Sequence, residues 1–230
     1  MKIQLKLAVA GITNDAKGFR VVVAKALDDA GLDLINRPNV APAFKGIMMT
    51  KDFELKLKNP ARKAGSIKEL SGDVELFVPK NDRAASVIVK SFPKQMGTPI
   101  QSDALKAAGI EIVAQTRAEY EALQEKKEKE RSKTGQRNQP AKFGPNDIVV
   151  SIKGATETVF ACEFHDPSDL TIQPSGSMDM HRYQDKQEFE RNFFYDFDAR
   201  LPETTTLVVF IVTRGALVKV PFALADTKLP

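Results

Sequence analysis

The chain has 230 residues, of which 42% are hydrophobic and 28% are charged, and its formal net charge is +4. This balance is typical of a folded globular protein and excludes an intrinsically disordered chain. The single cysteine, Cys162, excludes an intrachain disulfide. The longest apolar run of the C-terminal half, residues 207–212, is much shorter than the roughly 20 residues that a membrane-spanning helix needs.

The first ten residues, MKIQLKLAVA, alternate polar and apolar side chains at their start. A secretory signal has an unbroken apolar stretch of roughly 7–15 residues after its basic start, and Gln4 and Lys6 interrupt the run here. We therefore expect residues 3–11 to form a strand, in a protein that is either cytoplasmic or separated from its leader.

The first half continues as short strands separated by turn residues. Phe53, Leu55 and Leu57 alternate with polar residues, which is the period of a strand with one buried face. An acidic turn at residues 28–31 (DDAG) separates a strong apolar strand from a short one. The predicted strands occupy residues 3–11, 19–27, 32–34, 53–60, 74–78 and 87–92.

A short helix and an added strand follow these elements. Ser102 can cap a helix near residues 103–109, and Gly109 can end it in a left-handed conformation. Residues 110–113 then predict a strand that adds to the edge of the first group of strands.

Residues 114–146 predict a charged linker. Residues 117–142 contain eight basic and five acidic side chains, and the segment begins like a helix. From residue 132 onward, Gly, Asn, Gln and Pro indicate a flexible connector. The alternative is contact with nucleic acid or another anionic surface, which the interspersed glutamates disfavour. The candidate residues for that contact are Lys126, Lys127, Lys129 and Arg131.

Residues 147–230 repeat the order of the first half. Residues 158–164 lead into a second acidic turn at 166–169 (DPSD), and Leu170 and Ile172 follow it as Leu32 and Leu34 follow the first. The other matching segments are 3–11 with 147–155, 53–60 with 194–202, 74–78 with 207–212 and 87–92 with 217–222. This agreement in order favours an internal duplication.

Short strands rich in Val, Ile, Phe and Thr, between turns rich in Gly, Pro, Asp and Asn, resemble immunoglobulin-like or fibronectin-like β-sandwiches in tandem. The resemblance is one of architecture, because one cysteine and no tryptophan cannot supply the disulfide and core tryptophan of antibody domains. The expected fold is all-β, with sandwiches in residues 1–113 and 147–230 and the linker in 114–146.

Candidate chemistry is sparse in this sequence. Cys162 and His165 have the side chains of a zinc site, but strand alternation places them on opposite faces. With only two histidines, nucleophilic catalysis has few candidates. Asp196 and Asp198 are interpreted as a solvated strand face rather than an acid–base pair. We therefore predict no catalytic residue, no cofactor and no enzymatic activity.

The acidic turns are the remaining metal candidates. Calcium prefers oxygen ligands from loops, but the spacing here matches no calcium loop. Aspartate also favours turns because it accepts hydrogen bonds from its own backbone, so we interpret these residues mainly as turn formers. The candidates are Asp28, Asp29, Asp33, Asp166 and Asp169.

Two tandem sandwiches with little chemistry predict a structural or protein-interaction module, which we place in a bacterial envelope, surface or other multiprotein assembly. Exposed strand edges would bind a protein partner by strand addition. The alternative is an enzyme, or an accessory domain of one, with an acidic cleft between the modules. We favour a protein partner over nucleic acid or a small molecule, and a periplasmic or surface location over the cytoplasm.

Overall fold

A computed structural model describes residues 2–6, 15–36, 42–46, 52–131, 144–184 and 187–229. Strands dominate this part of the chain, whose α-helices are α1 (Asp103–Ala107) and α2 (Arg117–Arg131). Its strand pairs are antiparallel, so the expected all-β class is confirmed. The chain forms two compact units: the first contains residues 1–85 and 212–230, and the second contains residues 86–211.

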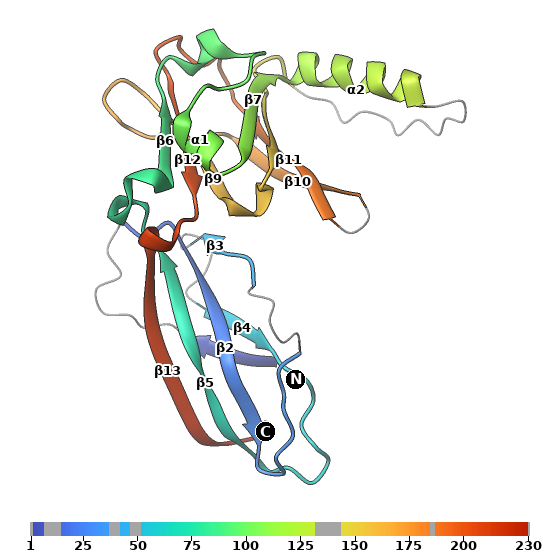
Figure 1. Cartoon of the computed structure of the whole chain (residues 1–230), viewed down its shortest axis with the longest axis vertical. Helices are drawn as coiled ribbons and strands as arrows, with labels where there is room; N and C mark the ends of the chain where they lie inside the picture. Colours follow the sequence, from blue (N-terminus) through green and yellow to red (C-terminus); the bar gives the residue numbers. More distant parts are fainter. Residues whose placement is uncertain are drawn as a thin grey trace. The chain divides into compact units, whose positions relative to one another are not determined.

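The first unit is built on a four-stranded sheet with the order β13-β5-β2-β3 (Figure 1). Its strands are β2 (Gly18–Asp28), β3 (Lys45–Gly46), β5 (Ser66–Phe77) and β13 (Leu217–Lys228). A separate two-stranded sheet consists of β1 (Lys2–Lys6) and β4 (Asp52–Lys56). Val21 of β2 and Val74 of β5 share a core with Leu55 and Leu57. The alternation predicted at 55 and 57 is confirmed, whereas the side chain of Phe53 lies outside the described residues.

The second unit is a β-sandwich whose sheets have the orders β10-β11-β8-β7 and β6-β12-β9 (Figure 1). The bounds are β6 (Ser86–Val89), β7 (Ile110–Thr116), β8 (Ile148–Gly154), β9 (Val159–His165), β10 (Gly176–Gln184), β11 (Gln187–Asp196) and β12 (Thr206–Ile211). Inward side chains of both sheets form one core. At its centre the ring of Phe164 contacts Phe92, Tyr195 and Phe197, with centroids between 4.9 and 5.5 Å apart.

The two units use the same strand pairings. β1 with β4 and β2 with β5 correspond to β8 with β11 and β9 with β12, in the order that the sequence predicts. The last strands are exchanged, because β13 pairs with β5 and β6 pairs with β12. The expected tandem boundaries at 113 and 147 are therefore wrong. The arrangement is nested, since the strand that completes each sheet comes from the other predicted copy.

Each exchanged strand follows a short 3-10 helix, Arg83–Ala85 before β6 and Arg214–Ala216 before β13. The residues that precede these helices are hydrogen-bonded: the Thr213 hydroxyl donates to Asp82 Oδ2 at 2.6 Å. This bond is the main reason why the pKa of Asp82 lies below its usual value. The remaining 3-10 helices of the described chain are Pro79–Asn81, Phe92–Gln95 and Thr156–Thr158.

The helix predicted near residues 103–109 is observed as α1, with Ser102 Oγ accepting from the Leu105 N–H at 3.5 Å. The strand that follows, β7, pairs with β8 in the second unit and does not complete the first sandwich as expected. The predicted linker is also structured as far as residue 131, because 114–116 continue β7 and 117–131 form α2. Residues 132–143 lie outside the described residues.

The two acidic turns have the same backbone hydrogen bonds. Asp28 N–H donates to Leu32 O at 3.1 Å, and Asp166 N–H donates to Leu170 O at 2.9 Å. Two residues further on, a second bond closes each corner, from the N–H of Leu34 in one and of Ile172 in the other. The local similarity that the sequence indicates is therefore present in three dimensions.

Candidate binding site at the edge of strand β7

Strand β7 is the edge strand of its sheet, and its outer edge is only partly covered. Hydrogen bonds from Ala155 N–H to Gly109 O and from Arg117 N–H to Asp147 O show that the odd-numbered residues of this strand bond to β8. In an antiparallel pair, the residues between them point their N–H and C=O groups the other way. Residues 110, 112 and 114 therefore direct their backbone groups to the outer edge.

The chain itself covers the upper part of this edge. Gly97 N–H donates to Ala114 O at 2.8 Å, and Ile100 N–H donates to Ile112 O at 2.9 Å. After Ile100 the chain leaves β7 and enters α1. The outward N–H and C=O of Ile110 consequently make no hydrogen bond within the described part of the chain. We call this position the free edge of β7.

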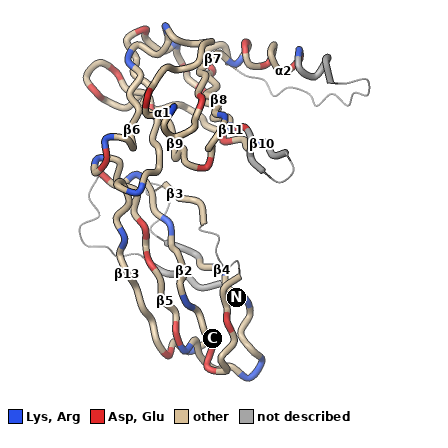
Figure 2. Tube along the Cα trace, in the orientation of Figure 1, with Lys and Arg blue, Asp and Glu red and all other residues tan. Residues whose placement is uncertain are grey.

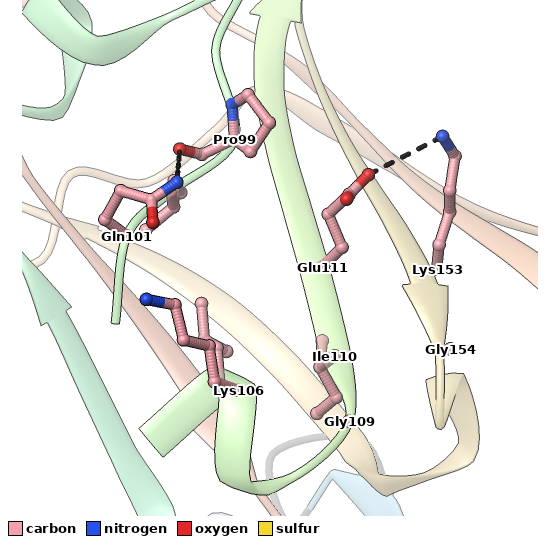
Figure 3. Close-up of a pocket in the computed structure, with 10 residues that line it drawn as sticks. Pro99, Gln101, Lys106, Gly109, Ile110, Glu111, Lys153 and Gly154 are labelled. Atoms are coloured by element: carbon pink, nitrogen blue, oxygen red, sulfur yellow. Dashed lines mark hydrogen bonds and ion pairs between the residues drawn. The ribbon is translucent and has the colours of Figure 1, made fainter. Parts of the chain in front are cut away.

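A pocket of about 410 Å³ opens at the free edge (Figure 3). Its apolar lining comes from Ile100, Leu105 and Ile110, which are also buried core residues. The complete lining is Pro99, Ile100, Gln101, Leu105, Lys106, Gly109, Ile110, Glu111, Lys153 and Gly154. The pocket thus combines an apolar floor, an open backbone edge and charged side chains.

Two lysines contribute ammonium groups to this pocket from different elements. Lys153 of β8 lies 3.6 Å from Glu111, so its charge is largely compensated. Lys106 of α1 reaches toward Gln101 (Figure 3), and none of the ion pairs among the described residues includes it. The pocket therefore has one uncompensated cation, on the same side as the free edge.

Close backbone contact shapes the end of the pocket. Gly109 has φ +68° and Gly154 has φ +92°, in the left-handed region that disfavours other residues. A Cβ atom on Gly154 would lie 2.0 Å from Gly109 O, so a side chain there cannot be accommodated without a backbone shift. These two glycines let β8 turn directly against the start of β7, where the pocket lies.

A smaller hollow of about 100 Å³ lies under α2 on the outer face of the same sheet. The strand register places Glu111, Lys153, Glu190 and Arg182 in one row across β7, β8, β11 and β10. Neighbours in such a row have Cβ atoms about 4.5–5.5 Å apart, so the alternating charges compensate one another. Glu190 is buried between its two cationic neighbours.

Polar side chains in the same region join α2 to the sheet. Ser151 Oγ donates to Asn192 Oδ1 at 2.6 Å, and Asn192 Nδ2 donates to Glu190 Oε1 at 3.1 Å. The hydroxyl of Tyr120 on α2 accepts from Arg182 at 3.4 Å. Burial raises the pKa of Tyr120 above its usual value, so the phenol stays neutral. These bonds account for the buried polar side chains of Ser151, Glu190 and Asn192 without a ligand.

The predicted calcium candidates do not converge on a metal site. Each carboxylate accepts hydrogen bonds from nearby backbone or, in the case of Asp169, contacts His165 at 2.8 Å. The backbone donors are Ala30, Leu32 and Ala61 for Asp28, Gly65 and Ser66 for Asp29, Ile35 for Asp33, and Ser168 and Leu170 for Asp166. No group of three or more metal-ligating side chains occurs within the described ranges.

Cys162 and His165 lie on opposite faces of β9, as the sequence predicts. Cys162 is buried in the sandwich core, and burial raises the pKa of its thiol to about 12. His165 contacts Glu163 and Asp169 on the other face of β9. The second histidine, His181, lies in β10, 3.3 Å from Asp179. None of these contacts brings cysteine and histidine together.

The candidate anion-binding residues lie on the second half of α2. Figure 2 shows both basic and acidic residues along the described part of this helix. Lys126 is exposed, whereas the side chains of Lys127, Lys129 and Arg131 lie outside the described residues. The exposed carboxylates of Asp196 and Asp198 belong to the end of β11 and the loop after it.

Comparison with protein-family models, with curated proteins and with solved structures gives no match for this chain. Among the helices of the described ranges, none is both long and apolar enough to cross a membrane.

Sequence reasoning did not identify the pocket at the free edge of β7. Lys106 and Ile110 belong to elements that were predicted, α1 and the strand after it, but neither residue carries a motif. The one sequence feature that points to this site is the segment SDALKAAGIEIV, in which a short capped helix ends directly before a strand. That pattern predicts a sharp change of direction, but not which strand edge it leaves open.

Proposed function

We propose that this protein is a non-catalytic protein-interaction module and that a partner binds at the free edge of β7. The observation that carries the proposal is Ile110, which is 5% exposed although its outward N–H and C=O lack hydrogen bonds within the described chain. Backbone N–H and C=O groups are strong hydrogen-bonding groups that folded proteins nearly always pair. An added strand would supply both missing bonds, which is how strand addition gains affinity.

The surroundings of Ile110 support this proposal. Protein interfaces combine an apolar centre with a polar rim, and the pocket has an apolar floor beside Gln101, Lys106 and Glu111. An immunoglobulin-like relationship and a place in a bacterial envelope assembly stay predictions.

The alternative function, acid–base catalysis in an acidic cleft, has a specific candidate in the hollow under α2. Glu111 and Glu190 both line it, on strands separated by β8. An acid–base pair needs one carboxyl group to stay protonated, which a neighbouring cation opposes. Lys153 lies between the two carboxylates in the register, and its ammonium group pairs with Glu111 at 3.6 Å. The arrangement therefore supports a structural charge row more than a catalytic pair.

Site-specific photo-crosslinking tests the interaction proposal. A photoreactive amino acid replaces Gln101, on the exposed rim of the pocket, and, as a control, Glu203, which is exposed elsewhere on the second unit. In native extract we expect a discrete protein adduct at position 101 that position 203 does not form. Equal background labelling at the two positions would contradict a partner site at the free edge of β7.

A further inference from the structure

We infer that the free edge of β7 binds the carboxyl-terminal residues of a partner chain, with Lys106 pairing with the terminal carboxylate. This inference rests on the proposed function and adds the chemistry of the ligand. It is carried by three features: the open backbone groups of Ile110, the limits of the groove, and the uncompensated charge of Lys106.

The open edge admits only a short segment. Residues 97–100 occupy the edge next to Ile112 and Ala114, and α1 stands beyond Ile110 at the other end. A strand advances about 3.3 Å per residue, so few partner residues can lie in the plane of the sheet. The earlier residues of a bound chain must leave this plane near Ile100, and the last ones face α1.

The direction of the existing pairing indicates which chain end faces α1. Residues 97–100 run antiparallel to β7 and leave it after Ile100. A partner segment that continues this antiparallel pairing opposite Ile110 runs toward the start of β7, where α1 ends at Ala107. Its carboxyl end therefore points toward α1, which blocks further extension.

The charge at this end of the pocket fits a carboxylate. Lys106 extends from α1 toward Gln101, on the side of β7 where the segment would lie (Figure 3). Its ammonium group has no ion-pair partner among the described residues, so a terminal carboxylate would gain a charge-assisted hydrogen bond without displacing an existing ion pair. The apolar floor formed by Ile100, Leu105 and Ile110 favours an apolar last side chain.

The test uses the full chain and two mixtures of acetylated hexapeptides that end in valine or leucine, one with free carboxylates and one with carboxamides. Binding is followed by the NMR shifts of the backbone amides of Ile110 and Gln101. We expect the free carboxylates to bind at least roughly tenfold more tightly than the carboxamides, because only they pair with Lys106. Higher salt should reduce this difference.

Two variants distinguish the effect of the Lys106 charge from an effect on folding. Lys106→Met keeps the length and helix propensity of the side chain but removes the ammonium group, so it should abolish the preference for carboxylates. Lys90→Met changes an exposed lysine away from the pocket and should leave the preference unchanged. The same spectra, recorded without peptide, show whether each variant is folded.

Equal binding of carboxylates and carboxamides, or an unchanged preference in Lys106→Met, would overturn the inference. Binding of octanoate, a carboxylate without a peptide backbone, in the absence of peptide binding would overturn it as well. If the adduct at position 101 forms but no free-carboxylate peptide binds, then the carboxyl-terminal ligand is wrong and the interaction module stands. If neither occurs, both proposals fail.

Discussion

The two acidic turns share one backbone but have different surroundings. In each, an aspartate at the start accepts hydrogen bonds through Oδ1 from the N–H groups two and four residues later. Asp28 is fully buried, and its Oδ2 accepts a further bond from Ala61 at 2.8 Å, whereas Asp166 is partly exposed. The same local sequence pattern therefore forms a turn in both units. In the first unit the aspartate also binds Ala61, which is distant in sequence, whereas in the second the bonds of Asp166 stay within the turn.

The two units also differ in how far apart in sequence their strands lie. Both use equivalent strand pairings, but the second unit is one uninterrupted stretch of chain and the first is assembled from two. The first unit thus depends on residues that are distant in sequence, both at its turn and at its edge strand. Four experiments test this contrast.

Removing residues 212–230 should have the largest effect. It deletes β13, whose register with β5 runs from Leu217 opposite Phe77 to Lys228 opposite Ser66, and the ion pair of Lys219 with Glu75 at 2.9 Å. We expect peptides of β2 and β5 to lose protection in hydrogen exchange, while those of β8 and β12 keep it. The fragment 86–211 is the control and should fold alone. Cooperative folding of fragment 1–113 would instead support the tandem boundaries.

Replacing the turn aspartates should separate the anchor from the local turn. Asp28→Ala leaves three backbone N–H groups without their acceptor in a buried site, whereas Asp166→Ala affects two in a more exposed one. We expect the fall in melting temperature for Asp28→Ala to be roughly twice that for Asp166→Ala, because unsatisfied buried donors cost more than solvated ones. Similar falls would show that the Ala61 contact contributes little.

The left-handed residue of each turn offers a smaller contrast. Gly31 has φ +84° and Asp169 has φ +63°. Gly31→Ala should destabilise the first unit by about 1 kcal/mol, because a Cβ atom disfavours this conformation. Asp169→Gly relieves the same conformational cost but removes an exposed contact with His165, so its effect should stay within roughly 0.5 kcal/mol. Denaturant unfolding measures both, and a larger loss for Asp169→Gly would contradict this account.

Acid should weaken the first turn by protonating Asp28. Backbone hydrogen bonds, that from Ala61 foremost, hold the pKa of Asp28 below its usual value of 3.8, although burial opposes this shift. Asp28 therefore contributes stability that is fully present well above pH 3.8 and is lost as pH falls through the lower pKa of the folded state.

The variant Asp28→Asn measures that contribution. It cannot titrate, so the difference in melting temperature between the wild type and this variant should shrink as pH falls from about 5 to 2. Asp166→Asn is the matched control in the other turn. A difference from Asp28→Asn that does not depend on pH would show that the carboxylate charge is not what stabilises the turn.

Part of the fold follows directly from local sequence. The period of two in residues 53–58, the Ser102 cap of α1 and the aspartates of the two turns predict elements that the structure contains. These features depend on residues within a few positions of one another, where side-chain alternation and backbone hydrogen bonds act. The burial of Cys162 also follows from the alternation that places it on the same face as Phe164, whereas Phe160 is only partly buried.

The partners of the strands do not follow from local sequence. The segments 87–92 and 217–222 look alike, so either could complete either sheet, and only the tertiary structure assigns β6 to β12 and β13 to β5. The pocket has the same origin, because Ile110 is left open only where residues 97–100 end their pairing with β7. Sequence periodicity decides which face of a strand is buried, whereas which strands pair, and which edge stays open, depends on long-range packing that no single segment encodes.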